Sequence, residues 1–288
     1  MVLVGVNWLS LRAEIDAKNM SEHHFLIAFG LTFIAGLATG IGSLIALIAK
    51  HTNTKFLCMS LGFSAGVMIY VSFMDILPIA KFELAKYLGE KNGMLSMLLA
   101  FFGGMGLIML IDFLIPKPNN PHELQSLEEL DLSNGRQKSL YRTGIIVALS
   151  LVVHNFPEGI ATFTSALSSG FEIAIPITFA IAIHNIPEGI AVSVPIYHAT
   201  GSKKKAFWMS FLSGLAEPLG ALIAWLFLYS FWSPLVNGIV LAAVAGIMVF
   251  ISLDELLPTA EKYGKHHISI SGLIAGMIIM ALSMFLFI

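Results

Sequence analysis

The chain has 288 residues, of which 57% are hydrophobic and only 12% are charged, and its mean hydropathy is +0.83. This composition excludes a water-soluble domain, so we interpret the chain as an integral membrane protein whose main solvent is the lipid bilayer. The formal net charge of −2 is too small to suggest nucleic-acid binding.

Predicted membrane spans take up most of the chain. A spanning helix needs ~20 largely apolar residues, and about eight windows meet that condition. They lie near residues 25–49, 56–79, 94–115, 143–166, 173–196, 206–229, 236–258 and 269–287. Lipid offers no hydrogen-bond partners to the backbone, and strand-like alternation is absent. The sequence therefore predicts an all-α, polytopic membrane helix bundle that forms a single transmembrane domain over residues 1–288.

The longest polar connection covers residues 116–142, between the third and fourth spans. Its prolines, its Asn-Pro pair and its mixed charges indicate a loop that is too short to be a domain. Of the sixteen Lys and Arg residues, eleven lie in the connections after the first, third, fifth and seventh spans, and five lie on the other side. Because cytoplasmic loops carry the excess of basic residues, these connections, including 116–142, are predicted to be cytoplasmic. Both termini then face away from the cytoplasm.

Two stretches of the first half recur in the second half. GLATGIGSLIA (Gly36–Ala46) aligns with GLAEPLGALIA (Gly214–Ala224) at an offset of 178, and AGVMIYVSFMDILP (Ala65–Pro78) aligns with AGIMVFISLDELLP (Ala245–Pro258) at an offset of 180. Five crossings separate the related spans, so they run in opposite directions. This pattern predicts an inverted repeat of spans 1–3 and 6–8 around spans 4–5, as in secondary transporters. A third pair, around Gly106 and Gly276, is too weak to align.

The second pair of aligned stretches, Ala65–Pro78 and Ala245–Pro258, carries acidic residues and a proline at equivalent places near the end of each stretch. Pro78 and Pro258 are predicted to end their helices. The opposite directions of the two spans place Asp75 at the outer mouth, and Asp254 and Glu255 at the cytoplasmic end.

A six-residue motif, H-N-x-P-E-G, occurs once in the fourth span and once in the fifth. The copies supply His154, Asn155 and Glu158, and His184, Asn185 and Glu188. At ~100° per residue, histidine and glutamate lie about 40° apart around a helix, and asparagine lies about 60° beyond the glutamate. Each helix therefore presents the three side chains as one fan. The prolines, Pro157 and Pro187, are predicted to kink their helices and free one backbone carbonyl each.

These polar groups lie near the middle of their spans, where the insertion of a charged side chain into the membrane costs a free energy of ~2.5–3.5 kcal/mol. Glu217, in the sixth span, adds a carboxylate at similar depth, and its repeat partner is Thr39. A single buried His or Glu is often only a hydrogen bond between helices. Here no Lys or Arg at that depth neutralises the acids, so a bound divalent cation is the economical counter-charge. Imidazole, carboxylate and amide ligands favour Zn, Fe, Mn or Co.

At these residues the sequence resembles the ZIP (Zrt/Irt-like) family of metal transporters, most closely its bacterial branch, and the resemblance covers essentially every span. It implies eight helices, outward termini, and uptake of zinc and related ions across the cell membrane through a site with two metal positions. It implies Glu158 and Glu188 as bridging carboxylates, His154 and His184 as nitrogen ligands of one position, and Asn155, Asn185 and Glu217 as oxygen ligands of the other. Met68 matches a family residue near the first position, but its repeat partner Met248 suggests packing.

The chain departs from the family pattern in two places. Some members carry a Gln-Asp pair where this chain has His184 and Asn185, and many have a histidine-rich loop where it has only His122. The sequence therefore predicts a non-enzymatic secondary importer of Zn²⁺, and also of Fe²⁺, Mn²⁺ and Co²⁺, with these ions as substrates and no cofactor. Its expected partners are the metal ions, the lipid bilayer and a second copy in a homodimer. The alternatives are a membrane-embedded metal sensor and a metalloenzyme, although no HExxH motif is present.

Overall fold

The structure is a computed structural model that describes residues 8–48, 54–114, 148, 151–153, 155–164, 166–167, 171–228 and 233–286. Within these ranges helices and short turns account for the chain, and no strand occurs. The elements are α1 (Trp8–Ile48), α2 (Thr54–Val71), η1 (Ser72–Ile76), α3 (Leu77–Leu88), α4 (Glu90–Leu114), α6 (Phe171–Thr200), α7 (Lys203–Gly214), α8 (Ala216–Ile223), η4 (Ala224–Leu228), α9 (Pro234–Ile251), η6 (Ser252–Leu256), α10 (Leu257–Tyr263) and α11 (His266–Leu286). His154 and the predicted loop 116–142 lie outside the described residues.

Six helical stretches in the described part are long and apolar enough to cross a membrane. They are Phe25–Ile48, Thr54–Leu88, Glu90–Ile111, Lys203–Phe227, Pro234–Glu261 and His266–Phe285. These stretches coincide with predicted spans 1–3 and 6–8, α6 covers the fifth window, and the helical residues 155–164 fall within the fourth. The all-α membrane bundle is confirmed, whereas the count of eight spans stays a prediction.

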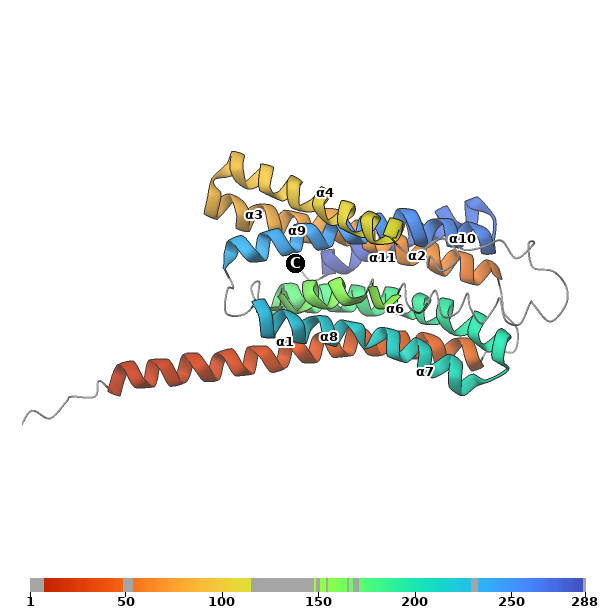
Figure 1. The fold of residues 1–288 in the computed structure, drawn as a ribbon, viewed down its shortest axis with the longest axis horizontal. Coiled ribbons are helices and arrows are strands. Elements are labelled where there is room, and N and C mark those ends of the chain that lie inside the picture. Colours follow the sequence, from red (N-terminus) through yellow and green to blue (C-terminus); the bar gives the residue numbers. More distant parts are fainter. Residues whose placement is uncertain are drawn as a thin grey trace, which may run out of the picture.

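The helices form two layers (Figure 1). α1, α7 and α8 make one layer, and α2, α3, α4, α9, α10 and α11 make the other. α6 lies between them and contacts α1 and α7 on one side and α2 on the other. Only 22% and 28% of the apolar windows of α4 and α11 are buried, so most of the apolar surface of these two helices faces away from the rest of the bundle.

The two prolines predicted to end helices do not end them. The helices continue past Pro78 to Leu88 and past Pro258 to Tyr263. Just before each proline the backbone widens into a π turn, η1 or η6, in which the N–H of Leu77 or Leu257 donates to a carbonyl five residues earlier. A π turn absorbs the missing N–H of proline without breaking the helix. The same device stands at equivalent positions in both halves of the repeat.

Glycines bring α1 and α6 into backbone contact. Gly42 of α1 lies against the carbonyl of Ile186, and Gly189 of α6 lies against the carbonyl of Thr39. A Cβ atom at either glycine would overlap the facing oxygen. Small residues permit this close approach between membrane helices.

The same pair of contacts recurs between α8 and the helical residues 155–164. Gly220 lies against the carbonyl of Phe156, and Gly159 lies against the carbonyl of Glu217. Each of these residues is the repeat counterpart of one in the α1–α6 contact, at an offset of 178 or 30 along the chain. The two contacts are thus related by the internal repeat.

Gly36 and Gly214 mark the axis that relates the two halves. They are repeat counterparts, and each lies against the backbone carbonyl of the other. A residue that contacts its own counterpart lies on the pseudo-two-fold axis. Figure 1 also shows α2 and α9 running in opposite directions, as an inverted repeat requires.

The structure also aligns the third pair of helices, α4 and α11. Between α2 and α11, Gly66 contacts the carbonyl of Leu273, and Gly276 contacts that of Phe63. The matching contacts between α9 and α4 join Gly246 to the carbonyl of Phe101, and Gly104 to that of Ala243. Gly276 therefore pairs with Gly104, at an offset of 172, and not with Gly106. The sequence signal missed this register because apolar helices resemble one another at many offsets.

We expect Gly189→Ala to destabilise the protein, because its Cβ would overlap the Thr39 carbonyl and force α1 and α6 apart. Overpacking of this kind costs about 1–3 kcal/mol. The temperature of thermal unfolding in one detergent should fall. Gly103→Ala is the matched control, because in the described chain no atom outside its own stretch of helix lies within 4 Å of the added methyl group. An equal fall in both variants would contradict the close-contact interpretation.

Candidate metal centre

Six of the seven predicted site residues lie in the described part of the chain, and all six are buried. They are Asn155, Glu158, His184, Asn185, Glu188 and Glu217, of which His184 is 1% exposed and the others 0%. The seventh, His154, lies outside the described residues. Lipid cannot satisfy such groups, so they must bind one another, water or ions.

Each motif copy lies on a helix that packs closely against another helix, α8 for the first copy and α1 for the second. Both copies stay helical through Pro157 and Pro187. The glycine after each glutamate then admits another helix: Gly159 contacts the backbone of Glu217 in α8, and Gly189 contacts α1. The closest helix contact in the first copy therefore places Glu217 beside the motif.

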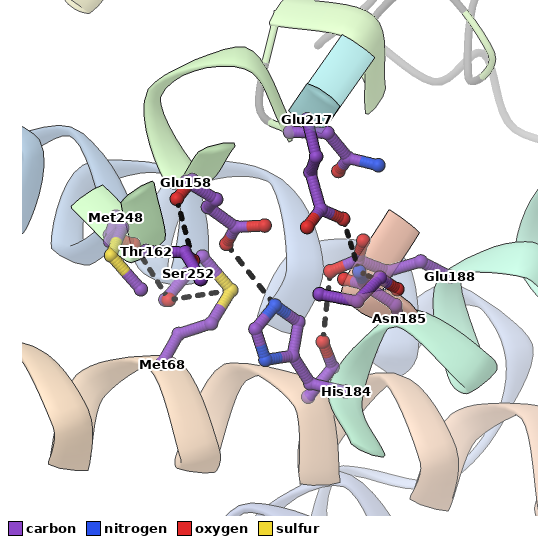
Figure 2. Close-up of polar contacts among 12 residues, drawn as sticks. Met68, Glu158, Thr162, His184, Asn185, Glu188, Glu217, Met248 and Ser252 are labelled. Carbon is purple, nitrogen blue, oxygen red and sulfur yellow. Dashed lines mark hydrogen bonds and ion pairs between the residues drawn. The ribbon is translucent and has the colours of Figure 1, made fainter. Parts of the chain in front are cut away.

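A direct contact joins the two motif copies. Oε1 of Glu158 lies 3.2 Å from Nε2 of His184, and both side chains are buried (Figure 2). The contact is an ion pair when the histidine is protonated and a hydrogen bond when its Nε2 carries the only proton. The carboxylate of one copy is thus paired with the imidazole of the other, which the fan within a single helix did not predict.

Asn155, Asn185 and Glu217 make up the oxygen-rich side of the centre, and both asparagines form hydrogen bonds there. Nδ2 of Asn185 donates to Oε1 of Glu217 and, at 3.0 Å, to the carbonyl of Ala35 in α1. Nδ2 of Asn155 donates to the carbonyl of Ser213 at 3.4 Å. Within the described residues, Oδ1 of each asparagine and Oε2 of Glu217 accept no hydrogen bond. These atoms are oxygen donors available to a cation.

Ser64 of α2 extends the centre into the second layer. Its hydroxyl donates to Oε1 of Glu188 at 3.1 Å, and it is fully buried. Sequence reasoning missed this residue, because a serine between Gly62 and Gly66 is also typical of plain helix packing. The contact ties the second motif copy to α2.

The centre concentrates negative charge. Glu158 and Glu188 lie within electrostatic range of the Glu217 carboxylate. The buried residues of the described chain include no Lys or Arg. In the same part of the chain, no three His, Cys, Asp or Glu side chains form a group that could hold a metal ion. Beside these carboxylates, the described part of the chain also offers the side-chain oxygens of Asn155 and Asn185.

Met68 packs beside the centre together with its repeat partner. Ser252 donates to Sδ of Met68 at 3.8 Å and to the carbonyl of Met248 at 2.8 Å. Both methionines are buried in the largest apolar cluster. These contacts agree with the packing role that the repeat suggested.

A small pocket beside Glu188 lies between α2, α6 and the η6–α10 segment. Its volume is about 20 Å³, and its lining includes Glu188, Ala191, Glu255 and Thr259, which is room for about one water molecule or ion. Glu255 is buried, and its repeat counterpart Asp75 is partly buried in η1. The pocket thus joins a motif carboxylate to an acid that the sequence placed at the cytoplasmic end.

An all-α membrane bundle with an inverted repeat and a buried centre of carboxylates, imidazole and amides is the architecture typical of secondary transporters. The sequence model of the family described as "ZIP Zinc transporter" matches residues 114–284. The chain therefore belongs to the ZIP zinc transporter family, and the resemblance found in its motifs is confirmed.

Relatives named "Zinc transporter ZupT" match the chain over nearly its whole length. The Streptococcus mutans protein is 61% identical over 269 residues, which cover 93% of this chain and 100% of that protein. The Clostridium perfringens protein is 57% identical over 279 residues, covering 92% and 98%. The Oceanobacillus iheyensis protein is 59% identical over 265 residues, covering 91% and 98%. The predicted bacterial branch is thus also confirmed.

Proposed function

We propose that this protein imports Zn²⁺ into the cytoplasm, and that Fe²⁺, Mn²⁺ and Co²⁺ follow the same route. The observation that carries the proposal is the buried cluster of three glutamates, one imidazole and two amides, with no Lys or Arg among the buried residues described. A divalent cation supplies the missing positive charge, and release of that cation on the far side completes transport. The family and the names of the relatives support a transporter rather than an enzyme.

Two metal positions share the glutamates of the motif copies. Glu158 and Glu188 bridge the positions, and His184 serves the nitrogen side together with His154. Asn155, Asn185 and Glu217 serve the oxygen side. Two contacts support this division. Glu158, a bridging carboxylate, contacts His184 of the nitrogen side, and Asn185 contacts Glu217, which belongs to the same oxygen side.

The ion leaves along the pocket beside Glu188. Glu255 and Thr259 offer oxygen atoms at the far side of that pocket. Asp75, the repeat counterpart of Glu255, stands at the outer mouth. The bias of basic residues supports this direction, with cytoplasmic loops after the odd-numbered spans and both termini outside, in the cell membrane.

We expect Glu158→Ala and Glu188→Ala each to abolish uptake, because each removes a carboxylate that both positions share. The measurement is uptake of radioactive Zn²⁺ into vesicles that contain the purified protein. Glu261→Ala is the control, since this glutamate is exposed on α10. Normal flux in a well-expressed Glu158→Ala or Glu188→Ala variant would refute the shared-carboxylate arrangement.

The orientation is tested by cysteines at the two ends of the path. In a Cys58→Ser background, Asp75→Cys should react with a membrane-impermeant thiol reagent in intact cells, and Glu255→Cys only in inside-out vesicles. The reason is that α2 and α9, which lead to these residues, run in opposite directions. Labelling of both cysteines from the same side would reject the topology.

The two sides should differ in metal preference. Imidazole suits zinc, whereas carboxylate and carbonyl oxygens suit manganese, and manganese and iron(II) bind a given site more weakly than cobalt does. Glu217→Gln should therefore reduce iron and manganese uptake more than zinc uptake, and His184→Ala should do the reverse. Competition among zinc, iron(II), manganese and cobalt in vesicles provides the measurement. An equal loss for every metal in both variants would mean that the two positions act as one unit.

A further inference from the structure

The two asparagines make the same contact in the two halves of the repeat. Asn185 donates to the carbonyl of Ala35, and Asn155 donates to the carbonyl of Ser213. Ala35 and Ser213 are repeat counterparts at an offset of 178. The pseudo-two-fold axis thus relates the surroundings of the two amides as well as the helices that carry them.

One helical turn beyond these carbonyls, the two halves carry different side chains. The residue four positions after Ser213 is Glu217, and the residue four positions after Ala35 is Thr39. Glu217 accepts a hydrogen bond from Asn185. By the repeat, Thr39 occupies the corresponding place beside Asn155. Thr39 therefore belongs to the oxygen-rich side by position, although it carries no charge.

The hydroxyl of Thr39 lacks the partner that a helical threonine ordinarily has. Such hydroxyls usually donate to the carbonyl four residues earlier, as Thr32 does to Ala28 at 3.0 Å. For Thr39 that carbonyl belongs to Ala35 and already accepts from Asn185. Thr39 is 0% exposed, and its Oγ1 has no hydrogen-bond partner within the described residues. Burial of a hydroxyl without a hydrogen-bond partner lowers the free energy of unfolding by about 1–3 kcal/mol.

The Thr39 hydroxyl lies beside the segment that Asn155 binds. A Cβ atom on Gly214 would come within 2.9 Å of Oγ1 of Thr39, and Asn155 donates to the adjacent carbonyl of Ser213. Among the described residues, the atoms without a hydrogen-bond partner include Thr39 Oγ1, Asn155 Oδ1, Asn185 Oδ1 and Glu217 Oε2. Both halves of the repeat thus contribute such oxygens near the axis.

We infer that Thr39 is an additional ligand of the oxygen-side metal position and supplies a neutral hydroxyl oxygen to the bound ion. The inference rests on the proposed metal transport and deepens it, because it adds α1 to the ligand-bearing helices. A hydroxyl is a hard oxygen donor, the kind of ligand that suits manganese, whereas imidazole suits zinc. Thr39 then helps to determine which metal ions the protein transports.

The test compares Thr39→Val, which keeps the shape but loses the hydroxyl, with Thr39→Ser, which keeps the hydroxyl. Binding of Mn²⁺ and Zn²⁺ to the purified full chain in lipid nanodiscs is measured by calorimetry. In Thr39→Val the affinity for Mn²⁺ should fall about tenfold, and the affinity for Zn²⁺ should fall less. Thr39→Ser should bind both ions like the unaltered chain. Equal affinities in Thr39→Val and the unaltered chain would overturn the assignment.

The absorption spectrum of bound Co²⁺ gives a second readout, which separates a ligand from a packing residue. Loss of a ligand lowers the coordination number and intensifies the visible bands, so Thr39→Val should strengthen them and Thr39→Ser should not. An unchanged spectrum with equal losses for all ions would assign the hydroxyl to packing or to a water molecule. If Thr39→Val fails to fold, Thr39→Ala in the same assay takes its place. Failure of the proposed transport would appear separately, as no Zn²⁺ uptake by the unaltered chain.

Discussion

The need to satisfy buried polar groups without help from lipid governs this bundle. Each of the three glutamates of the centre binds a side chain from another helix: Glu158 binds His184, Glu188 binds Ser64, and Glu217 binds Asn185. These contacts join the two motif copies to each other and to α2 and α8. An ion entering the centre must compete with them, so binding and the arrangement of the helices are coupled.

Close helix contacts make this network achievable. Where glycine lets two backbones touch, carbonyl groups come within reach of side chains on the neighbouring helix. Ala35 and Ser213 use their carbonyls in this way to hold the two asparagines. Gly36 and Gly214, which touch across the axis, lie one residue further along in each half. Packing and polar chemistry therefore depend on the same short stretches of α1 and α7.

The repeat supplies a symmetric scaffold whose two halves carry different chemistry. Glu217 and Thr39 occupy equivalent places, yet one is an acid and the other a neutral hydroxyl. Asp75 and Glu255 both lie within a π turn, but the pocket beside Glu188 is lined by Glu255. Such differences give the two halves of a symmetric structure different side chains at equivalent places, and the proposed transport of a metal ion in one direction would use that asymmetry.

The sequence by itself determined the helical class, the position of most spans, two of the three repeat pairs and the types of polar side chain that the doubled motif buries. Hydropathy, periodicity and local motifs depend only on neighbours along the chain, so a single sequence contains them. Only the tertiary structure decided that the helices continue past Pro78 and Pro258, that Gly104 pairs with Gly276, and that Glu158 binds the histidine of the other copy. These features depend on which backbones approach closely enough to touch, and contacts between residues distant in the chain leave no local pattern.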